Sequence, residues 1–409
     1  DLTVTPKSMG VFRVILCLTL ILTVQCVKKN TKKIKELSNI IRQFTGDTAT
    51  RYLYLYKYRG PYNFVFSGLR IVGNLITMYN LGSKQVKAEI KKVLGLTSSL
   101  ERNICETMNF ITTYDAIRKR KSNVVFNSKI FYRSGMNIKK EAKKSSCVGG
   151  SVQVLNFTDQ QAAMDTINDF YPNWDETEYG QYLSKPLGAN TNEVVLNRLM
   201  MSTVLKRPFY YNPWHSEFTD IQGDVVYNSY FIEKVDDFLF EFYEKHNVYL
   251  FRENFVGERL SYVIIFPKYK TKNVARELYL ILKGEMMSDI LLKAASLTNK
   301  TRMGMRMPLL EFRFRVDLKD VLPSGALLSL EDKRALSGLT GDLSNMTQFP
   351  HSEFTHFSFW DDDPRRYNVT YLNIDKPFVF LIMDNKFDVP LKLTTFTGME
   401  NYFEQYDRW

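Results

Sequence analysis

The chain has 409 residues, of which 44% are hydrophobic and 14% aromatic, and its formal charge is +11 at pH 7. This composition excludes an intrinsically disordered chain, and the length is enough to bury a large core. The excess of positive charge favours polyanionic partners, such as sulfated glycans or other anionic surfaces. No linker rich in proline, glycine or serine divides the chain and no repeat recurs along it, so we expect one large domain.

The N-terminal segment has the pattern of a secretory signal. The first methionine is Met9, so we expect residues 1–8 to lie upstream and to take no part in the fold. Val11–Val24 is apolar apart from one arginine and two threonines and is shorter than the roughly 20 residues that span a bilayer. A positive start and small or neutral residues at the end are typical of a cleaved signal peptide. We interpret residues 9–26 as that peptide and residues 27–409 as one secreted domain; the alternative is an N-terminal membrane anchor.

Cysteines and sequons agree with secretion. Of the four cysteines, Cys17 and Cys26 belong to the predicted signal peptide, which leaves Cys105 and Cys147. Two cysteines are too few for a scaffold built on disulfides. Four N-glycosylation sequons predict that their asparagines lie at the surface. These are Asn156, Asn299, Asn345 and Asn368.

Helical patterns dominate the first 170 residues. Lys84–Leu96 repeats its apolar residues with helical spacing and meets a stop signal at Gly95, which predicts an amphipathic helix. Asp159–Phe170 has the same periodicity, and Asp159 is a good N-cap. Both segments are expected to bury one face.

Strand patterns dominate the rest. Val124–Phe131 and Leu310–Asp317 alternate between apolar and polar residues, which predicts strands with one wet face. Tyr262–Phe266 and Phe378–Met383 are continuous apolar runs, as expected of strands that are covered on both faces. The chain is therefore predicted to be a mixed α and β protein.

The most informative stretch is Leu372–Phe380, which reads LNIDKPFVF. It resembles the C-terminal signature of the serpin (serine protease inhibitor) superfamily, in which polar and basic residues precede Pro-Phe and an apolar run. The residues that fit the signature are Asn373, Asp375, Lys376, Pro377 and Phe378.

Further blocks resemble the same family in the family's order. They are Asn63–Leu96, Ser122–Tyr132, Thr177–Tyr182, Val195–Phe209, Arg259–Lys268, Arg306–Leu322 and Ala335–Thr340. The chain departs from the pattern at Thr203 and Leu205, where glycine and tryptophan are usual. The resemblance implies an α+β protein with the serpin fold, in which about nine α-helices surround three β-sheets.

The resemblance also implies a long reactive-centre loop, which inserts into the large sheet after a protease cleaves it. Insertion needs a hinge of Gly, Thr and Ala, because bulky or charged side chains do not fit beneath a packed sheet. No alanine lies between Leu336 and the signature, and a candidate strand at Phe354–Trp360 is followed at once by three aspartates. The 36-residue spacing from Leu336 to Leu372 is roughly a dozen short of the family's, or about 40 Å of reach. We therefore expect no inhibition by insertion.

The predicted remnant is a truncated loop tip that consists of Asp361, Asp362, Asp363, Arg365 and Arg366. The aspartates are expected to form a solvated acidic tip, since no further ligands follow at the spacing of a calcium loop. The dibasic pair is either protease bait or an ordinary exposed pair. The four histidines have no metal-ligand spacing, so no metal site is expected.

A basic cluster is the other candidate site. In some serpins the corresponding region binds heparin-like glycans, because sulfate recognition uses clustered cations. The alternative is a wet basic face without a specific ligand. In the implied fold Cys105 and Cys147 lie near neighbouring helices and could bond, or remain free buried thiols. The cluster consists of Arg118, Lys119, Arg120, Lys121, Lys139, Lys140, Lys143 and Lys144.

These patterns predict a secreted, extracellular, glycosylated and monomeric serpin-family protein that is non-inhibitory. We expect it to act by binding, with sulfated glycosaminoglycans or an extracellular protein as partner. One alternative is a serine protease inhibitor or decoy that blocks through Asp361–Tyr367 without insertion; another is a small-molecule carrier. Motifs of hydrolases, metalloproteases, P-loops and dinucleotide sites are missing from the sequence, so we expect no enzyme, cofactor or nucleic-acid partner.

Overall fold

The computed structural model describes most of the chain between residues 31 and 398. The predicted signal peptide lies outside the described residues. The described residues are 31–55, 63–112, 123–135, 147, 151–170, 183, 185–189, 191, 193–202, 205–309, 311–316, 342–347 and 369–398.

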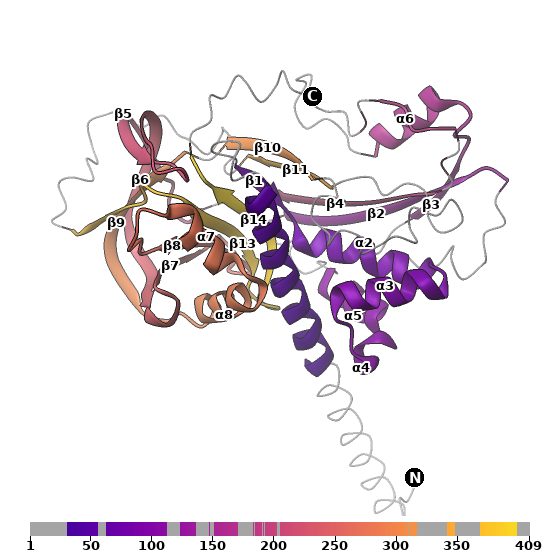
Figure 1. Cartoon of the computed structure of the whole chain (residues 1–409), viewed down its shortest axis with the longest axis horizontal. Coiled ribbons are helices and arrows are strands. Elements are labelled where there is room, and N and C mark those ends of the chain that lie inside the picture. Colours follow the sequence, from indigo (N-terminus) through magenta and orange to yellow (C-terminus); the bar gives the residue numbers. More distant parts are fainter. Residues whose placement is uncertain are drawn as a thin grey trace, which may run out of the picture.

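Eight α-helices lie within these residues, where about nine were expected for the whole chain. The first covers residues 31–55 and runs through the middle of the molecule (Figure 1). The others are α2 (Gly68–Leu81), α3 (Lys84–Leu94), α4 (Ser98–Glu101), α5 (Ile104–Thr112), α6 (Gln160–Asn168), α7 (Val274–Leu282) and α8 (Gly284–Ala295).

The two helices predicted from periodicity are confirmed. In α3 the Ser83 side chain accepts a hydrogen bond from the Val86 backbone, and the helix ends at Gly95 in the left-handed conformation (φ 61°). In α6 the N-cap is Asp159, whose side chain accepts from the Ala162 backbone. This helix ends at Asn168, two residues before the predicted end.

Fourteen strands form three sheets within the described residues, which confirms the α+β class. The strands are β1 (Phe64–Phe66), β2 (Asn123–Arg133), β3 (Ser151–Leu155), β4 (Glu193–Ser202), β5 (Tyr210–Thr219), β6 (Val225–Tyr243), β7 (Val248–Asn254), β8 (Leu260–Pro267), β9 (Lys300–Pro308), β10 (Glu311–Val316), β11 (Asp342–Thr347), β12 (Tyr371–Asn373), β13 (Phe378–Asp384) and β14 (Val389–Phe396).

The largest sheet has nine strands in the order β1-β14-β13-β8-β7-β6-β9-β12, with β5 also paired to β6. The predicted apolar runs form β8 and β13, which pair antiparallel and are buried along their whole length. They are buried because α7 and α8 contact β8 and β7 while other parts of the core cover the opposite face. Continuous hydrophobicity therefore correctly predicts strands covered on both sides.

The two smaller sheets have the orders β3-β2-β4 and β10-β11. Strand β2 pairs parallel with β3 and antiparallel with β4. Strands β10 and β11 contact β1 at one end of the nine-stranded sheet. In Figure 1 α6 lies at the far end of β2, β3 and β4, remote from α7 and α8.

Candidate functional site

The C-terminal signature carries the chain from an edge strand of the nine-stranded sheet into its centre. Strand β12 pairs parallel with β9, and Asn373 lies opposite Arg306. The next residue, Ile374, is fully buried and donates its backbone N–H to the Arg306 carbonyl at 2.8 Å. Three paired residues and one buried side chain thus anchor the end of the segment that precedes the signature.

The next three signature residues, Asp375, Lys376 and Pro377, each have a structural partner. The Asp375 carbonyl accepts from the Thr219 backbone N–H at 2.8 Å, and the Pro377 carbonyl accepts from the Tyr269 hydroxyl at 2.5 Å. The Lys376 ammonium lies 5.9 Å from the centre of the Tyr269 ring. Burial raises the pKa of the Asp375 carboxyl. The geometry fits a fixed crossing between strands, and it offers no arrangement for acid–base or nucleophilic chemistry.

The structure gives an upper limit to the length of the loop before β12. Strand β10 pairs with Asp342–Thr347, so 23 residues (348–370) connect β11 to β12. An extended chain of that length spans about 75 Å. Length alone therefore does not exclude insertion, and the argument against it depends on side chains. The candidate strand Phe354–Trp360 and the predicted loop tip lie outside the described residues.

Within the described residues, β4 and β11 are edge strands of two separate sheets, with no ladder between them. Strand β4 has β2 on one side, and β11 has β10 on one side. An inserting segment would have to pair with an edge strand such as these. Its side chains would then have to fit between the strands and the structure that covers them.

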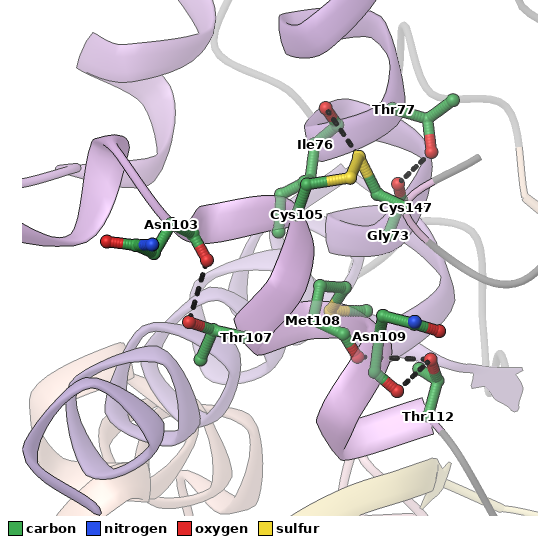
Figure 2. The surroundings of a disulfide bond; sticks show 10 residues. All are labelled: Gly73, Ile76, Thr77, Asn103, Cys105, Thr107, Met108, Asn109, Thr112 and Cys147. Atoms are coloured by element: carbon green, nitrogen blue, oxygen red, sulfur yellow. Dashed lines mark hydrogen bonds between the residues drawn. A yellow bond between two sulfur atoms is a disulfide. The ribbon is translucent and has the colours of Figure 1, made fainter. Parts of the chain in front are cut away.

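A disulfide joins Cys105 in α5 to Cys147, which settles the alternative that the sequence left open (Figure 2). The two Cα atoms are 4.6 Å apart, within the usual range for a bonded pair. Cys147 is fully buried, and its sulfur lies 3.9 Å from the Ile76 carbonyl of α2. The disulfide therefore links α5 to a residue 42 positions further along the chain, and Cys147 also contacts α2.

The disulfide encloses every residue of the predicted basic cluster. Between the two cysteines the sequence has ten lysines and arginines but three acidic residues, a net charge of +7 out of +11 for the chain. The cluster residues themselves, Arg118–Lys121 and Lys139–Lys144, lie outside the described residues.

The structure adds lysines that are not recognised from the sequence, next to Arg102, which the sequence already places near the cluster. Lys33 donates to the Asn103 side chain, and the Thr97 hydroxyl donates to Glu36, so the first helix meets the chain around α4. Lysines near this junction were not predicted, because only these tertiary contacts bring the two segments together. The exposed cations there are Lys32, Lys35, Lys92 and Arg102.

The sequons occupy different places. Asn156 follows β3 and is exposed, and its Oδ1 accepts from the Thr158 backbone N–H at 3.2 Å and from the Thr158 hydroxyl at 2.6 Å. Asn299 is exposed just before β9, and Asn345 lies within β11. Asn368 lies outside the described residues. The first two positions are open to solvent, as an acceptor site requires.

Within the described part of the chain, His, Cys, Asp and Glu side chains do not gather in groups of three or more that could hold a metal ion. The helices described there also lack the combined length and hydrophobicity that crossing a membrane requires.

Comparisons with known proteins agree with this architecture. The family model described as "Serpin (serine protease inhibitor)" matches residues 49–397. Human glycosylated kallistatin is 14% identical with a TM-score of 0.70, and the match covers 90% of this chain and 98% of that one. The structure of thyroxine-binding globulin in complex with thyroxine is 14% identical with a TM-score of 0.69, and the match covers 89% of this chain and 99% of that one. Serpin-12 of Manduca sexta is 16% identical with a TM-score of 0.66, and the match covers 87% of this chain and 98% of that one. A search of curated proteins finds no match.

Proposed function

Since this chain belongs to the serpin family and has the serpin fold, we propose that it is a secreted, non-inhibitory serpin that acts by binding extracellular glycans or proteins. The family consists of protease inhibitors rather than enzymes, which agrees with the lack of catalytic motifs. The observation that carries the proposal is the composition of residues 348–370.

Residues 348–370 are unsuited to become a sheet strand. They contain no glycine or alanine, two prolines and six aromatic residues, and three successive aspartates. A strand inserted beside β4 would turn alternate side chains toward the covered face, where large rings overpack the core. The aspartates would lose their hydration without gaining partners, and each proline would remove a ladder hydrogen bond.

Secretion is supported by two features of the described residues. Disulfides such as Cys105–Cys147 persist mainly in oxidising compartments. The exposed Asn156 side chain is held by Thr158, the hydroxyl residue of its own sequon. We propose that this site and Asn299 carry glycans.

Polyanion binding is supported by the distribution of charge. The segment enclosed by the disulfide has a net charge of +7, and exposed lysines and an arginine surround the neighbouring junction of the first helix with α4. Sulfated glycosaminoglycans are the extracellular polyanions that match such a surface. This combination favours a glycan over an uncharged partner.

Two alternatives have weaker support. The dibasic pair Arg365-Arg366 is consistent with a decoy or a blocking inhibitor for trypsin-like proteases. A carrier role is suggested by the resemblance to thyroxine-binding globulin, a structure solved with thyroxine. At 14% identity that resemblance supports the fold and gives no evidence for the ligand.

The decisive experiment incubates the protein with trypsin-like and chymotrypsin-like proteases and separates the products by denaturing electrophoresis. We expect cleavage without a band at the summed mass, because a trapped acyl-enzyme requires insertion. The variant Arg365→Ser/Arg366→Ser shows whether trypsin cuts at this pair. A stable covalent complex that disappears in this variant would overturn the non-inhibitory assignment.

A further inference from the structure

A charged cluster is buried inside the nine-stranded sheet. We define the Lys234 cluster as Lys234 and Asp236 of β6, Glu253 of β7 and Tyr262 of β8. The Lys234 side chain is 1% exposed, and its ammonium lies 2.6 Å from both Glu253 carboxylate oxygens and 3.3 Å from Asp236 Oδ2. The Tyr262 hydroxyl donates to Glu253 at 2.5 Å. Every charge in the cluster therefore has a partner of opposite sign.

The cluster lies where two strands separate. The ladder between β6 and β7 ends at the pair Leu239–Arg252, whereas β6 stays paired with β9 along its other edge back to Phe231. Glu253 is the next residue of β7 and lies opposite Tyr262 in the register with β8. The Lys234–Glu253 ion pair thus bridges strands that no backbone hydrogen bond joins at this point.

The chain that leaves β4 is attached to this cluster. The Phe209 ring lies 5.5 Å from the Lys234 ammonium and 6.2 Å from the Tyr262 ring. Arg207 reaches Asp236 at 3.5 Å. The Lys206 ammonium contacts Glu258, in the turn between β7 and β8, at 2.8 Å. Three residues of the β4 exit, which we define as residues 205–209, therefore contact β6, β7 or their connection to β8.

The Lys234 cluster is better explained by selectivity for one packing arrangement than by stability. Replacing a buried ion pair by apolar residues of similar volume is often neutral or stabilising, whereas removing one partner is strongly destabilising. Around Lys234 the neighbours Phe209 and Phe238 are large rings that could pack in more than one way. A bidentate pair that also accepts from Tyr262 is satisfied in one geometry only.

We propose that the Lys234 cluster is a latch that holds the β4 exit against the nine-stranded sheet. Removing one of its charges releases residues 205–209 while the centre of the sheet stays folded. The latch couples the sheet that contains β4 to the sheet that contains β6. It does not depend on glycan binding or on the lack of inhibition.

The test is hydrogen exchange of the full-length protein, followed by mass spectrometry. Glu253→Gln keeps the shape of the side chain but leaves Lys234 with Asp236 alone. We expect exchange in residues 205–209 to become at least about tenfold faster, with little change in β13 and β14. The double variant Lys234→Met/Glu253→Gln should restore most of the protection, because it removes the buried ammonium together with its main carboxylate partner and leaves Asp236 with Arg207.

The matched control is Asp384→Asn, which breaks another buried ion pair of the same sheet, Arg259–Asp384 at 2.8 Å. It should accelerate exchange in β13 and β14 and leave residues 205–209 protected. Equal acceleration of both regions in Glu253→Gln would overturn the latch, as would unchanged exchange at 205–209. If Glu253→Gln does not fold, Arg207→Ser replaces it, because that side chain is 63% exposed. This variant should accelerate exchange at 205–209 alone, and no acceleration there would also overturn the proposal.

Discussion

Gly304 of β9 lies directly beneath the ring of Tyr371 of β12. The two residues are register partners, and a Cβ atom at position 304 would lie 2.5 Å from Cδ1 and Cε1 of the ring. Such a distance is far inside van der Waals contact, and the backbone that carries the ring is held in place because β12 pairs with β9. Glycine at this position therefore leaves room for the Tyr371 ring, so that β12, which leads into the signature, can pair closely with β9.

Gly304→Ala is expected to destabilise the protein by about 1–3 kcal/mol, because overpacking forces the ring or the strand to shift. Chemical denaturation measures the loss. Adding Tyr371→Ala to the same chain should remove the clash, so that the two substitutions are not additive. Gly188→Ala is the matched control, since no atom lies within 4 Å of a Cβ there. An equal loss in both glycine variants would contradict the role of the ring.

The disulfide is expected to contribute substantially to stability. Its cysteines are 42 residues apart, and the chain-entropy model gives about 4 kcal/mol for a loop of this size. Cys105→Ala/Cys147→Ala should lower the denaturant midpoint accordingly. Dithiothreitol should lower the midpoint of the wild type toward that of the variant without affecting the variant. No effect of the double substitution would show that the bond constrains little in the unfolded chain.

Acid should weaken one surface cluster in particular. A single oxygen of Asp289 in α8 accepts from Tyr243 at 2.9 Å, from Lys245 at 2.8 Å and from His246 at 2.6 Å. The Lys245 hydrogen bond is the largest cause that lowers the pKa of Asp289, to about 2 from 3.8. Since the folded pKa is below the unfolded one, the stabilisation is complete above pH 3.8 and is lost as the pH falls toward 2.

This linkage can be measured with Asp289→Asn. The difference in urea midpoint between wild type and variant should be constant at neutral pH and should shrink as the pH falls below about 4. Glu285→Gln removes an exposed carboxylate from the same helix and serves as the control. A difference that stays constant down to pH 2.5 would mean that Asp289 is not stabilised by its three donors.

Cleavage at the dibasic pair tests the mechanical part of the proposal. Inhibitory serpins release strain when the cleaved loop inserts, so the cleaved form resists heat better. Since residues 348–370 are unsuited to insertion, nicking at Arg365 or Arg366 should leave the melting temperature unchanged or lower it. Differential scanning calorimetry before and after limited trypsin treatment measures this. A rise of tens of degrees would show that the segment does insert.

Several elements follow from local patterns alone. The apolar runs of β8 and β13 and the end of α3 at Gly95 are predicted because burial and left-handed conformations constrain residue type directly. Strand β2 is also predicted, but its expected wet face is wrong toward its end, where Ile130 and Phe131 lie on opposite faces and are both buried. Strand β12 is not predictable in this way, because three residues are too few to show the alternation of apolar and polar residues that identifies a strand. Its pairing with β9 depends on residues almost 70 positions away.

The candidate sites, too, are predictable from the sequence only where they do not depend on contacts between distant residues. The possible Cys105–Cys147 bond was proposed from the implied fold, but only the tertiary structure brings the sulfurs together. Lys234 was missed entirely, since Glu233–Asp237 (EKVDD) is typical of a solvent-exposed strand face. It is buried because β6 and β7 separate and Glu253 fills the space. The residue pattern of one strand does not reveal where a neighbouring strand separates from it.

The last prediction concerns the basic cluster. If Arg118–Lys121 forms a site together with Lys139, Lys140, Lys143 and Lys144, the protein should bind immobilised heparin more tightly than its net charge alone requires. Replacing Arg118, Lys119, Arg120 and Lys121 by Ser should then lower the eluting salt concentration sharply. The reason is that clustered cations act on one ligand within a Debye length of about 8–10 Å, whereas scattered cations are screened from each other.

The control replaces four exposed lysines outside the disulfide-enclosed segment by Ser, namely Lys185, Lys270, Lys272 and Lys300. Both variants lose four positive charges, so a difference between them reports the arrangement of charge rather than its amount. The disulfide adds an independent test, because Cys105→Ala/Cys147→Ala keeps every lysine and arginine. Weaker retention of this variant would mean that the closed loop organises the cations. Equal elution shifts in the two charge variants would reduce the cluster to an ordinary basic surface and remove the support for a glycan site.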